Sequence, residues 1–191
     1  MKSSYKPKDA QKLLSTWQQQ WWVGGGNAID LYLDKQTREH DDLDIVILRR
    51  DSDSIRELLN GWDLWIGLGE GKLEDQALNI FDKITQDQAV LWCRPSSKDE
   101  WAFELLFTPS DGEYWIFKRD DRIRLPIESI GLVSQKGIPY LRPEIVLLFK
   151  AKSPQGKNQA DFDVVRPSLD LDARLWLKYA LGLSYIQLIR G

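Results

Sequence analysis

The chain has 191 residues, of which 42% are hydrophobic and 29% are charged, and its formal net charge is −3. This composition is typical of one compact globular domain and excludes a disordered or fibrous protein. The acidic balance argues against general nucleic-acid binding, which requires a strongly basic face. The single cysteine, Cys93, excludes an internal disulfide and a zinc site built from several cysteines. No apolar run approaches the roughly 20 residues of a membrane helix, so we expect a cytoplasmic protein without membrane contact.

The first elements in chain order are three helices and two strands. Ala10, Leu13, Leu14 and Trp17 have helical spacing and predict a helix over residues 8–20. A short buried strand over 21–24 follows, then a helix that opens at three glycines and continues to residue 33. The polar segment 35–41 is expected to be a loop, 42–48 is a strand rich in β-branched residues, and 55–59 is a helix.

The middle of the chain favours short strands separated by glycine, proline and serine turns. Residues 74–86 are ambiguous, since they match neither the helical nor the strand periodicity. The strands are predicted over 64–68, 89–94, 101–107, 114–117 and 127–130.

The last third is helical. Pro143 stands at the favoured first position of a helix over 144–152, and a second helix is predicted over 157–165. Ser168 is expected to cap a third helix that Gly182 ends. The sequence therefore predicts an α+β fold, with a mixed β-sheet flanked by helices in a core over 1–140 and a helical C-terminal region over 141–191 packed on it.

Three consecutive glycines, Gly24, Gly25 and Gly26, follow the strand 21–24 and open the next helix. Glycine lets backbone amides approach a ligand closely, and a helix N-terminus presents unpaired N–H groups at its positive end. This arrangement favours an anion such as a phosphate. A tight structural turn explains the glycines equally well.

Two aspartates, Asp42 and Asp44, lie two residues apart on the predicted strand 42–48, so both carboxylates share a face while Leu43 points into the core. Adjacent like charges on one strand face repel each other unless a cation neutralises them. Mg²⁺ is a suitable partner because it binds carboxylates together with substrate phosphates. The competing interpretation is a solvated edge strand. With the glycine turn, the pair predicts metal-dependent chemistry on a nucleoside triphosphate.

A two-metal site usually needs a further carboxylate from a neighbouring strand. Glu104 is the preferred candidate, because a lone charge inside the apolar strand 101–107 costs free energy unless it is paired; a structural ion pair is the alternative. Asp111 is the second candidate, although aspartate has an ordinary role in a turn.

A site for a nucleoside triphosphate also needs basic residues near the phosphates. Arg38 and His40 precede the aspartates in a loop that can reach back over the glycine turn. An ordinary surface loop residue is an equally good interpretation of His40. Lys150 and Lys152 can neutralise triphosphate charge, but lysines near a helix C-terminus are also favoured by the helix dipole alone.

The segments 24–30 and 37–44 together resemble the polymerase-β-type nucleotidyltransferase superfamily, and within it the aminoglycoside and lincosamide nucleotidyltransferases. Those enzymes carry a Trp-aliphatic-Gly-Gly-Gly run, an Ala-(Ile/Val)-Asp helix and a Thr-Arg-x-His-Asp-Asp-(Ile/Leu)-Asp stretch. Asn27 departs from the tryptophan or serine expected after the glycines, and segment 104–109 does not align cleanly. The run 140–152 resembles uncharacterised nucleotidyltransferase-like proteins more than drug-modifying ones.

The resemblance implies a nucleotidyltransferase-like mixed sheet, with ATP or another nucleoside triphosphate as co-substrate and two Mg²⁺ ions. It implies in-line attack of an acceptor hydroxyl on the α-phosphorus, with pyrophosphate leaving. The metal-binding and catalytic residues would be Asp42, Asp44 and Glu104. The nucleotide-binding residues would be Gly24, Gly25, Gly26, Asn27, Arg38, His40 and Lys150.

The leading hypothesis is an enzyme that moves a nucleoside monophosphate, AMP before others, onto a hydroxyl of a small molecule such as an aminoglycoside-like antibiotic, or of a protein or RNA. The alternative is a non-catalytic nucleotide- or partner-binding module, such as one component of a toxin–antitoxin pair. The position of Glu104 discriminates between them, since catalysis needs it close to both aspartates. A kinase is disfavoured because the chain has no Gly-x-x-x-x-Gly-Lys-(Ser/Thr) loop.

Overall fold

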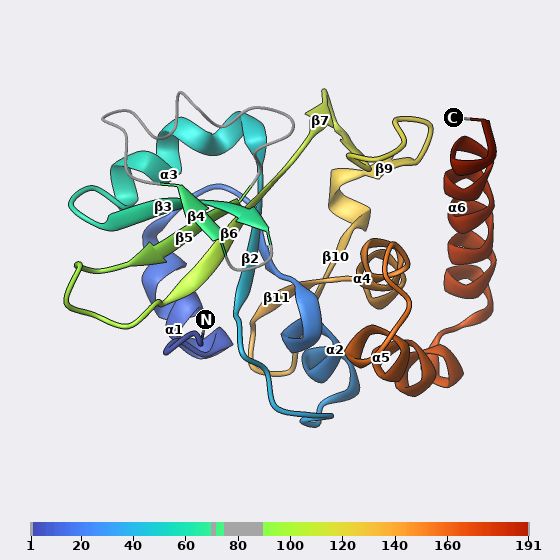
Figure 1. Cartoon of the computed structure of the whole chain (residues 1–191), viewed down its shortest axis with the longest axis horizontal. Coiled ribbons are helices and arrows are strands. Elements are labelled where there is room, and N and C mark those ends of the chain that lie inside the picture. The colour runs from blue at the N-terminus through green and yellow to red at the C-terminus, as the bar shows by residue number, and fades with distance from the viewer. Residues whose placement is uncertain (1, 70–71, 75–89, 191) are drawn as a thin grey trace.

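A computed structural model describes residues 2–69, 72–74 and 90–190 (Figure 1). Its centre is an eight-stranded sheet in the order β10-β11-β1-β2-β6-β5-β3-β4. A small sheet, β7-β8-β9, lies beyond the end of β6. The strands of the large sheet are β1 (Trp21–Val23), β2 (Asp44–Leu48), β3 (Asp63–Gly69), β4 (Lys72–Glu74), β5 (Val90–Arg94), β6 (Phe103–Thr108), β10 (Gly131–Val133) and β11 (Pro139–Leu141). Those of the small sheet are β7 (Ser110–Asp111), β8 (Tyr114–Ile116) and β9 (Arg124–Pro126).

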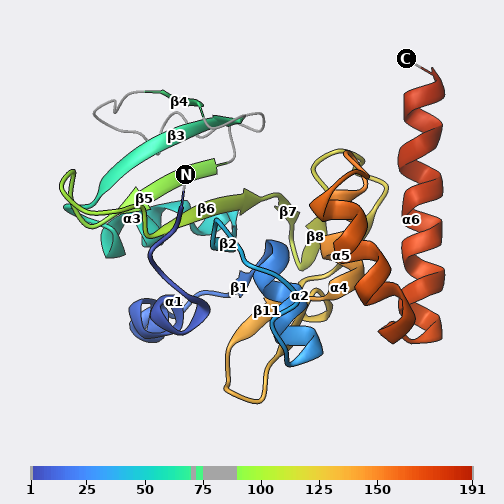
Figure 2. The ribbon, with the colours of Figure 1, turned by 60° about the horizontal axis from the view of Figure 1, so that its bottom comes forward.

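Six α-helices surround the large sheet within the described residues: α1 (Pro7–Leu13), α2 (Gly25–Leu33), α3 (Ser52–Leu58), α4 (Pro143–Lys150), α5 (Lys157–Val165) and α6 (Leu171–Arg190). Helices α4 and α5 pack against α2, and α6 packs against α4 on the outer side (Figure 2). The C-terminal helices therefore stand beside the β11–β1–β2 part of the sheet, away from β3 and β4. None of the helices in the described ranges is long and apolar enough to cross a membrane.

The centre of the sheet is mixed because β2 pairs with β1 antiparallel and with β6 parallel. Alternation along β2 follows from the period of two residues in a strand. Ile45 and Ile47 are fully buried in the core, and Leu43 just before the strand is 1% exposed. Asp44 points to the other face, where it is only partly buried. The sheet thus fixes which side chains reach the site, and the expected α+β class is confirmed.

The strand that carries the aspartates is shorter than predicted. It begins at Asp44 rather than Asp42, because the preceding carbonyl groups accept other hydrogen bonds. The Asp41 carbonyl accepts from the Ser3 amide (2.6 Å), and the Asp42 carbonyl accepts from the side chain of Asn27 (2.9 Å). Asp42 therefore precedes the ladder rather than belonging to it.

Other boundaries also differ from expectation. The first helix ends at Leu13 and continues as a 3-10 turn over Leu14–Thr16, after which Trp17 turns to donate to the Ser54 hydroxyl. The predicted strand over 127–130 is instead a 3-10 turn over Ile127–Ser129 followed by Ile130; Ile127 and Ile130 are buried without pairing in a sheet.

The last helix runs from Leu171 through Gly182 to Arg190. A glycine costs only about 1 kcal/mol in a helix interior, and the sequence beyond it contains no proline. Asp170 rather than Ser168 caps this helix, since its carboxylate accepts from the Ala173 amide (2.8 Å). The ambiguous segment 74–86 lies outside the described residues, apart from Glu74 in β4.

Candidate active site

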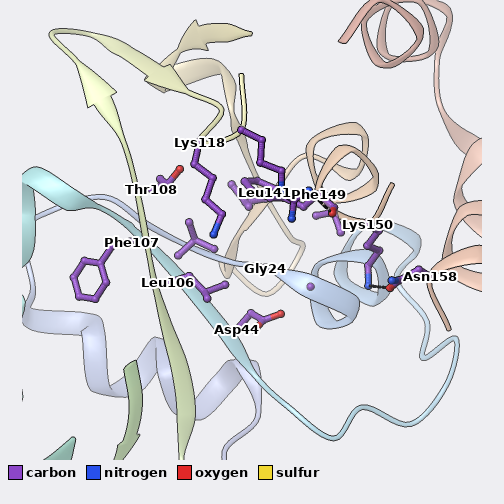
Figure 3. Close-up of a pocket in the computed structure, with 14 residues that line it drawn as sticks. Gly24, Asp44, Leu106, Phe107, Thr108, Lys118, Leu141, Phe149, Lys150 and Asn158 are labelled. Carbon is purple, nitrogen blue, oxygen red and sulfur yellow. Dashed lines mark hydrogen bonds between the residues drawn. The ribbon is translucent and has the colours of Figure 1, made fainter. Parts of the chain in front are cut away.

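A cavity of about 280 Å³ opens between the sheet, the first turn of α2, and helices α4 and α5 (Figure 3). Gly24, Gly25 and Asp44 form one wall. Apolar side chains from β2, β6, β11 and α4 form its floor. The remaining lining residues are Val46, Leu106, Phe107, Thr108, Lys118, Arg119, Leu141, Val146, Phe149, Lys150 and Asn158.

The glycine turn lies directly against the residues that carry the candidate chemistry. Gly25 has a φ of +57°, and a Cβ there would collide with Asp44 Oδ2. A Cβ on Gly26 would collide with the His40 ring and would lie 2.7 Å from Arg38 Nη2. The Gly24 amide donates to the Asp44 backbone carbonyl (2.9 Å), so it is already used. Gly25 and Gly26 supply first-turn amides, which have no partner within the helix.

The carboxylates of Asp44 and Glu104 are neighbours on adjacent parallel strands, because Asp44 of β2 is in register with Glu104 of β6. Burial, and then the charge of Asp42, raises the pKa of Asp44 to about 7. Burial, and then Asp44 and Asp42, raises the pKa of Glu104 to about 8. Asp44 and Glu104 therefore resist simultaneous ionisation in the absence of a cation.

Asp111, the other candidate for a third carboxylate, is not part of this group. Its side chain is 74% exposed in the small sheet and lies 3.8 Å from Arg124 Nη1. Of the two candidates, only Glu104 is a strand neighbour of Asp44.

A divalent ion fits this set of donors by its chemistry. In the described part of the chain, no three His, Cys, Asp or Glu side chains already converge closely enough to hold an ion. Mg²⁺ does not require such a cage, since it commonly uses one or two carboxylates together with waters and substrate phosphates. Carboxylates whose pKa values rise through mutual repulsion are suited to a dication that removes the repulsion.

Two cations on the loop after β8 were missed by the sequence analysis. Lys118 and Arg119 line the cavity, and Lys118 points into it opposite Asp44 (Figure 3). Burial, and then Arg119, Lys152 and Arg49, lowers the pKa of Lys118. Among the described residues no ion pair involves Lys118. An unpaired cation among other cations favours an anionic ligand, and only the fold brings this loop to the site.

Lys150 and Arg38, both predicted to contact nucleotide, share one buried carboxylate. Arg38 donates to both oxygens of Asp161, from Nε (2.9 Å) and Nη2 (3.0 Å). Lys150 Nζ lies 2.8 Å from Asp161 Oδ2 and donates to Asn158 Oδ1 at 3.3 Å. Lys150 still lines the cavity. Lys152 is exposed on the turn that follows α4.

His40 and Asn27 form contacts that join helix α2 to the loop before β2. His40 Nε2 lies 2.6 Å from Asp30 Oδ2, and Asp30 also accepts from the Thr37 amide and hydroxyl. His40 and Asn27 line a second depression with Asp30 rather than the wall beside Asp44. The Asp30 carboxylate thus organises the loop, a role that the sequence did not single out.

Taken together, the site places carboxylates at one wall, the cations Lys118 and Arg119 at another, and a helix N-terminus beside the carboxylates. Carboxylates can hold a divalent ion, while cations and first-turn amides can bind phosphates. This combination suits chemistry on a magnesium–nucleotide complex.

Comparison with known proteins agrees with this interpretation of the site. A family model described as aminoglycoside-2''-adenylyltransferase matches residues 8–66, less than a third of the chain, and this segment contains the glycine turn and both aspartates. A search of curated protein sequences found no match.

Two solved structures of ANT(2'')-Ia have a similar fold. One is a crystal structure in complex with adenylyl-2''-tobramycin, with a TM-score of 0.56 and 12% identity, covering 90% of this chain and 92% of that chain. The other is a solution structure of this antibiotic-resistance factor, with a TM-score of 0.58 and 14% identity. The match covers 96% of this chain and 92% of that chain. The predicted resemblance to the aminoglycoside nucleotidyltransferases is therefore confirmed, by sequence over the first third of the chain and by fold over most of it. The family match agrees with the predicted class of enzyme.

Proposed function

We propose, from this resemblance and the site, that the protein is a Mg²⁺-dependent nucleotidyltransferase acting in the cytoplasm. It transfers a nucleoside monophosphate, with AMP from ATP as the first candidate, to a hydroxyl group of a small molecule. One cavity wall carries Asp44 beside Gly25, and the opposite side carries Lys118. That juxtaposition of carboxylate and cation across one cavity is the observation that carries the proposal.

The proposed roles follow from the positions of the side chains. Asp42, Asp44 and Glu104 would hold Mg²⁺, which when bound neutralises the charge of the triphosphate and of the leaving pyrophosphate. The first-turn amides of Gly25 and Gly26 would bind phosphate oxygens. Lys118 and Arg119 would hold the pyrophosphate as it leaves. Glu104, with its raised pKa, would complete the metal site or accept the proton of the attacking hydroxyl.

The acceptor is proposed by analogy with the relatives. A fold neighbour is described in complex with an adenylylated aminoglycoside, and the family model is named for the same chemistry. Aminoglycosides and lincosamides are therefore the first acceptors to test. The division into a core over 1–140 and a helical region over 141–191 carries the related proposal that the helices help to form the acceptor site.

The test is pyrophosphate release from ATP, GTP, CTP and UTP with Mg²⁺ across a panel of hydroxyl-bearing acceptors. The decisive comparison is Asp44→Asn against Asp41→Asn, because Asp41 is an exposed neighbour and undergoes the same chemical change. We expect release that depends on Mg²⁺ and acceptor, persists in Asp41→Asn and is lost in Asp44→Asn. Equal activity in both variants would refute the aspartate assignment.

The non-catalytic alternative makes a different prediction in the same experiment. It rests on the observation that the described carboxylates do not already converge as a three-ligand site. Nucleotide binding without turnover with any acceptor, protein and RNA included, would favour this binding module over the enzyme.

A further inference from the structure

One buried carboxylate outside the motif holds two of the cations at the site. Asp161 on α5 is 2% exposed. It binds Arg38 through both of its oxygens and Lys150 through Oδ2, at 2.8 to 3.0 Å. Burial alone would raise its pKa, but the hydrogen bonds from Arg38 and Lys150 hold the pKa below its ordinary value. Asp161 is therefore a charged partner shared by three segments of the chain.

Lys150 connects Asp161 to the cavity, and Arg38 connects it to the first turn of α2 beside the cavity. The Arg38 guanidinium lies against Gly26 in the first turn of α2. Lys150, from the last turn of α4, reaches the cavity beside Gly24 and Asp44 (Figure 3). The neighbouring residues of α5 also face the site: Asn158 lines the cavity, and the charge of Lys157 lowers the pKa of Asp44 and Glu104.

Without the carboxylate these cations would lose their fixed positions. Lysine carries an ammonium on a flexible four-carbon stem, with about 2 kcal/mol of rotamer entropy. Two cations that share one carboxylate also repel each other once that carboxylate is removed. A lysine that contacts a phosphate in the transition state has to be held in place, since misplacement by about 1 Å can cost 10²-fold in rate.

We infer that Asp161 is a positioning residue: by binding Lys150 and Arg38 together, it fixes where the phosphates of a bound nucleotide lie relative to Asp44. This inference rests on the proposed function. Asp161 itself is buried behind the two cations and acts through them.

The test is Asp161→Asn against Asp163→Asn, an exposed position on the same helix. We expect Asp161→Asn to lower kcat per folded molecule by about 10- to 100-fold. The KM for the magnesium–nucleotide should stay unchanged or fall, because the variant removes a negative charge. Asp163→Asn should leave both constants unchanged. If the wild type is active and Asp161→Asn has an unchanged kcat, the inference about Asp161 is overturned while the proposed function stands.

A double-mutant cycle separates positioning from a structural role. In a Lys150→Met background, Asp161→Asn should lower kcat by less than it does in the wild type, because one of the two cations through which it acts is gone. A purely structural carboxylate would cause the same further loss in both backgrounds. Full additivity would therefore overturn the inference.

A measurement that needs no activity keeps the two hypotheses distinguishable. The Lys150 ammonium, held at 2.8 Å by a buried carboxylate, should give a slowly exchanging ¹⁵N–¹H signal in the nucleotide-free protein. The signal is assigned by its loss in Lys150→Arg. It should vanish in Asp161→Asn and persist in Asp163→Asn; persistence in Asp161→Asn would overturn the inference. Absence of any nucleotidyl transfer by the wild type would instead overturn the proposed function.

Discussion

Replacing Gly25 by alanine tests the contact between the glycine turn and the aspartate. The change adds a single methyl group in a residue with a φ of +57°, directly against Asp44 Oδ2. Gly112 is a matched control. It has nearly the same φ, +54°, and a Cβ added there would meet no heavy atom within 4 Å.

The expected magnitudes follow from these two environments. A left-handed backbone costs a non-glycine residue roughly 1–2 kcal/mol, so Gly112→Ala should lower the free energy of unfolding by about that amount. Gly25→Ala should add a further loss of roughly 1–3 kcal/mol, which is typical of overpacking. Because it displaces a proposed metal ligand, Gly25→Ala should also lower transfer about 100-fold or more. Gly112→Ala should stay active.

The assay is urea unfolding of both variants together with Mg²⁺-dependent pyrophosphate release. A second background isolates the collision. In Asp44→Ala the colliding oxygen is absent, and the remaining Cβ of residue 44 lies 3.6 Å from the new methyl group, an ordinary contact. Gly25→Ala should then cost no more than Gly112→Ala. Equal destabilisation by both glycine variants in the wild-type background, with activity retained in Gly25→Ala, would refute the reasoning.

Three further predictions concern the charged groups. Burial, and then Asp42, raises the pKa of Asp44 from 3.8 to about 7. The folded state therefore binds this proton more tightly than the unfolded state, and metal-free protein loses stability as pH rises from about 4 to about 7. Asp44→Asn should raise the free energy of unfolding in EDTA by at most roughly 4 kcal/mol near pH 8 and by about half as much near pH 5.5; equal gains would contradict the raised pKa. Glu104→Gln should lower transfer about 100-fold or more, whereas Asp111→Asn should leave it unchanged, and the reverse result would exchange the two assignments. Lys118→Ala should weaken nucleotide binding about tenfold or more in calorimetry, and the exposed Lys98→Ala should not; equal effects would reduce Lys118 to general surface charge.

The sequence predicted the motif well because its signals are local. The glycines, the following helix and the alternation from Leu43 to Ile47 depend on neighbours in the chain, and the structure has them in the expected order. Pro143 likewise begins α4, as its position predicted. Such features follow from residue type and periodicity alone.

What the sequence missed depends on contacts between distant segments. Lys118 and Arg119 follow a short strand and carry no local signal, yet they line the cavity. Asp161 is one of two aspartates on α5, and only the fold brings Arg38 and Lys150 to it. The same holds for Asp42, whose place before β2 depends on Asn27.

Glu104 is an intermediate case. The preference for it over Asp111 came from the free-energy cost of a lone charge in an apolar strand, which is a local argument. Its place beside Asp44 came from parallel pairing between strands that are far apart in sequence. The sequence could identify the residue but not its neighbour.

The parallel register of β2 and β6 also restricts how such a site can change during evolution. Positions on the site-facing side of a strand recur every two residues, roughly 6.6 Å apart, and the residues between them, such as Ile45 and Leu105, are fully buried. That step is several times longer than a metal–oxygen bond of about 2.1 Å. Within the paired part of β2 and β6, a carboxylate moved along its strand by one such step would therefore no longer be in register with its partner, whereas Asp42 reaches the site from before the ladder. We therefore expect Asp44 and Glu104 to be kept or moved together, as a pair in register, in any active descendant of this fold.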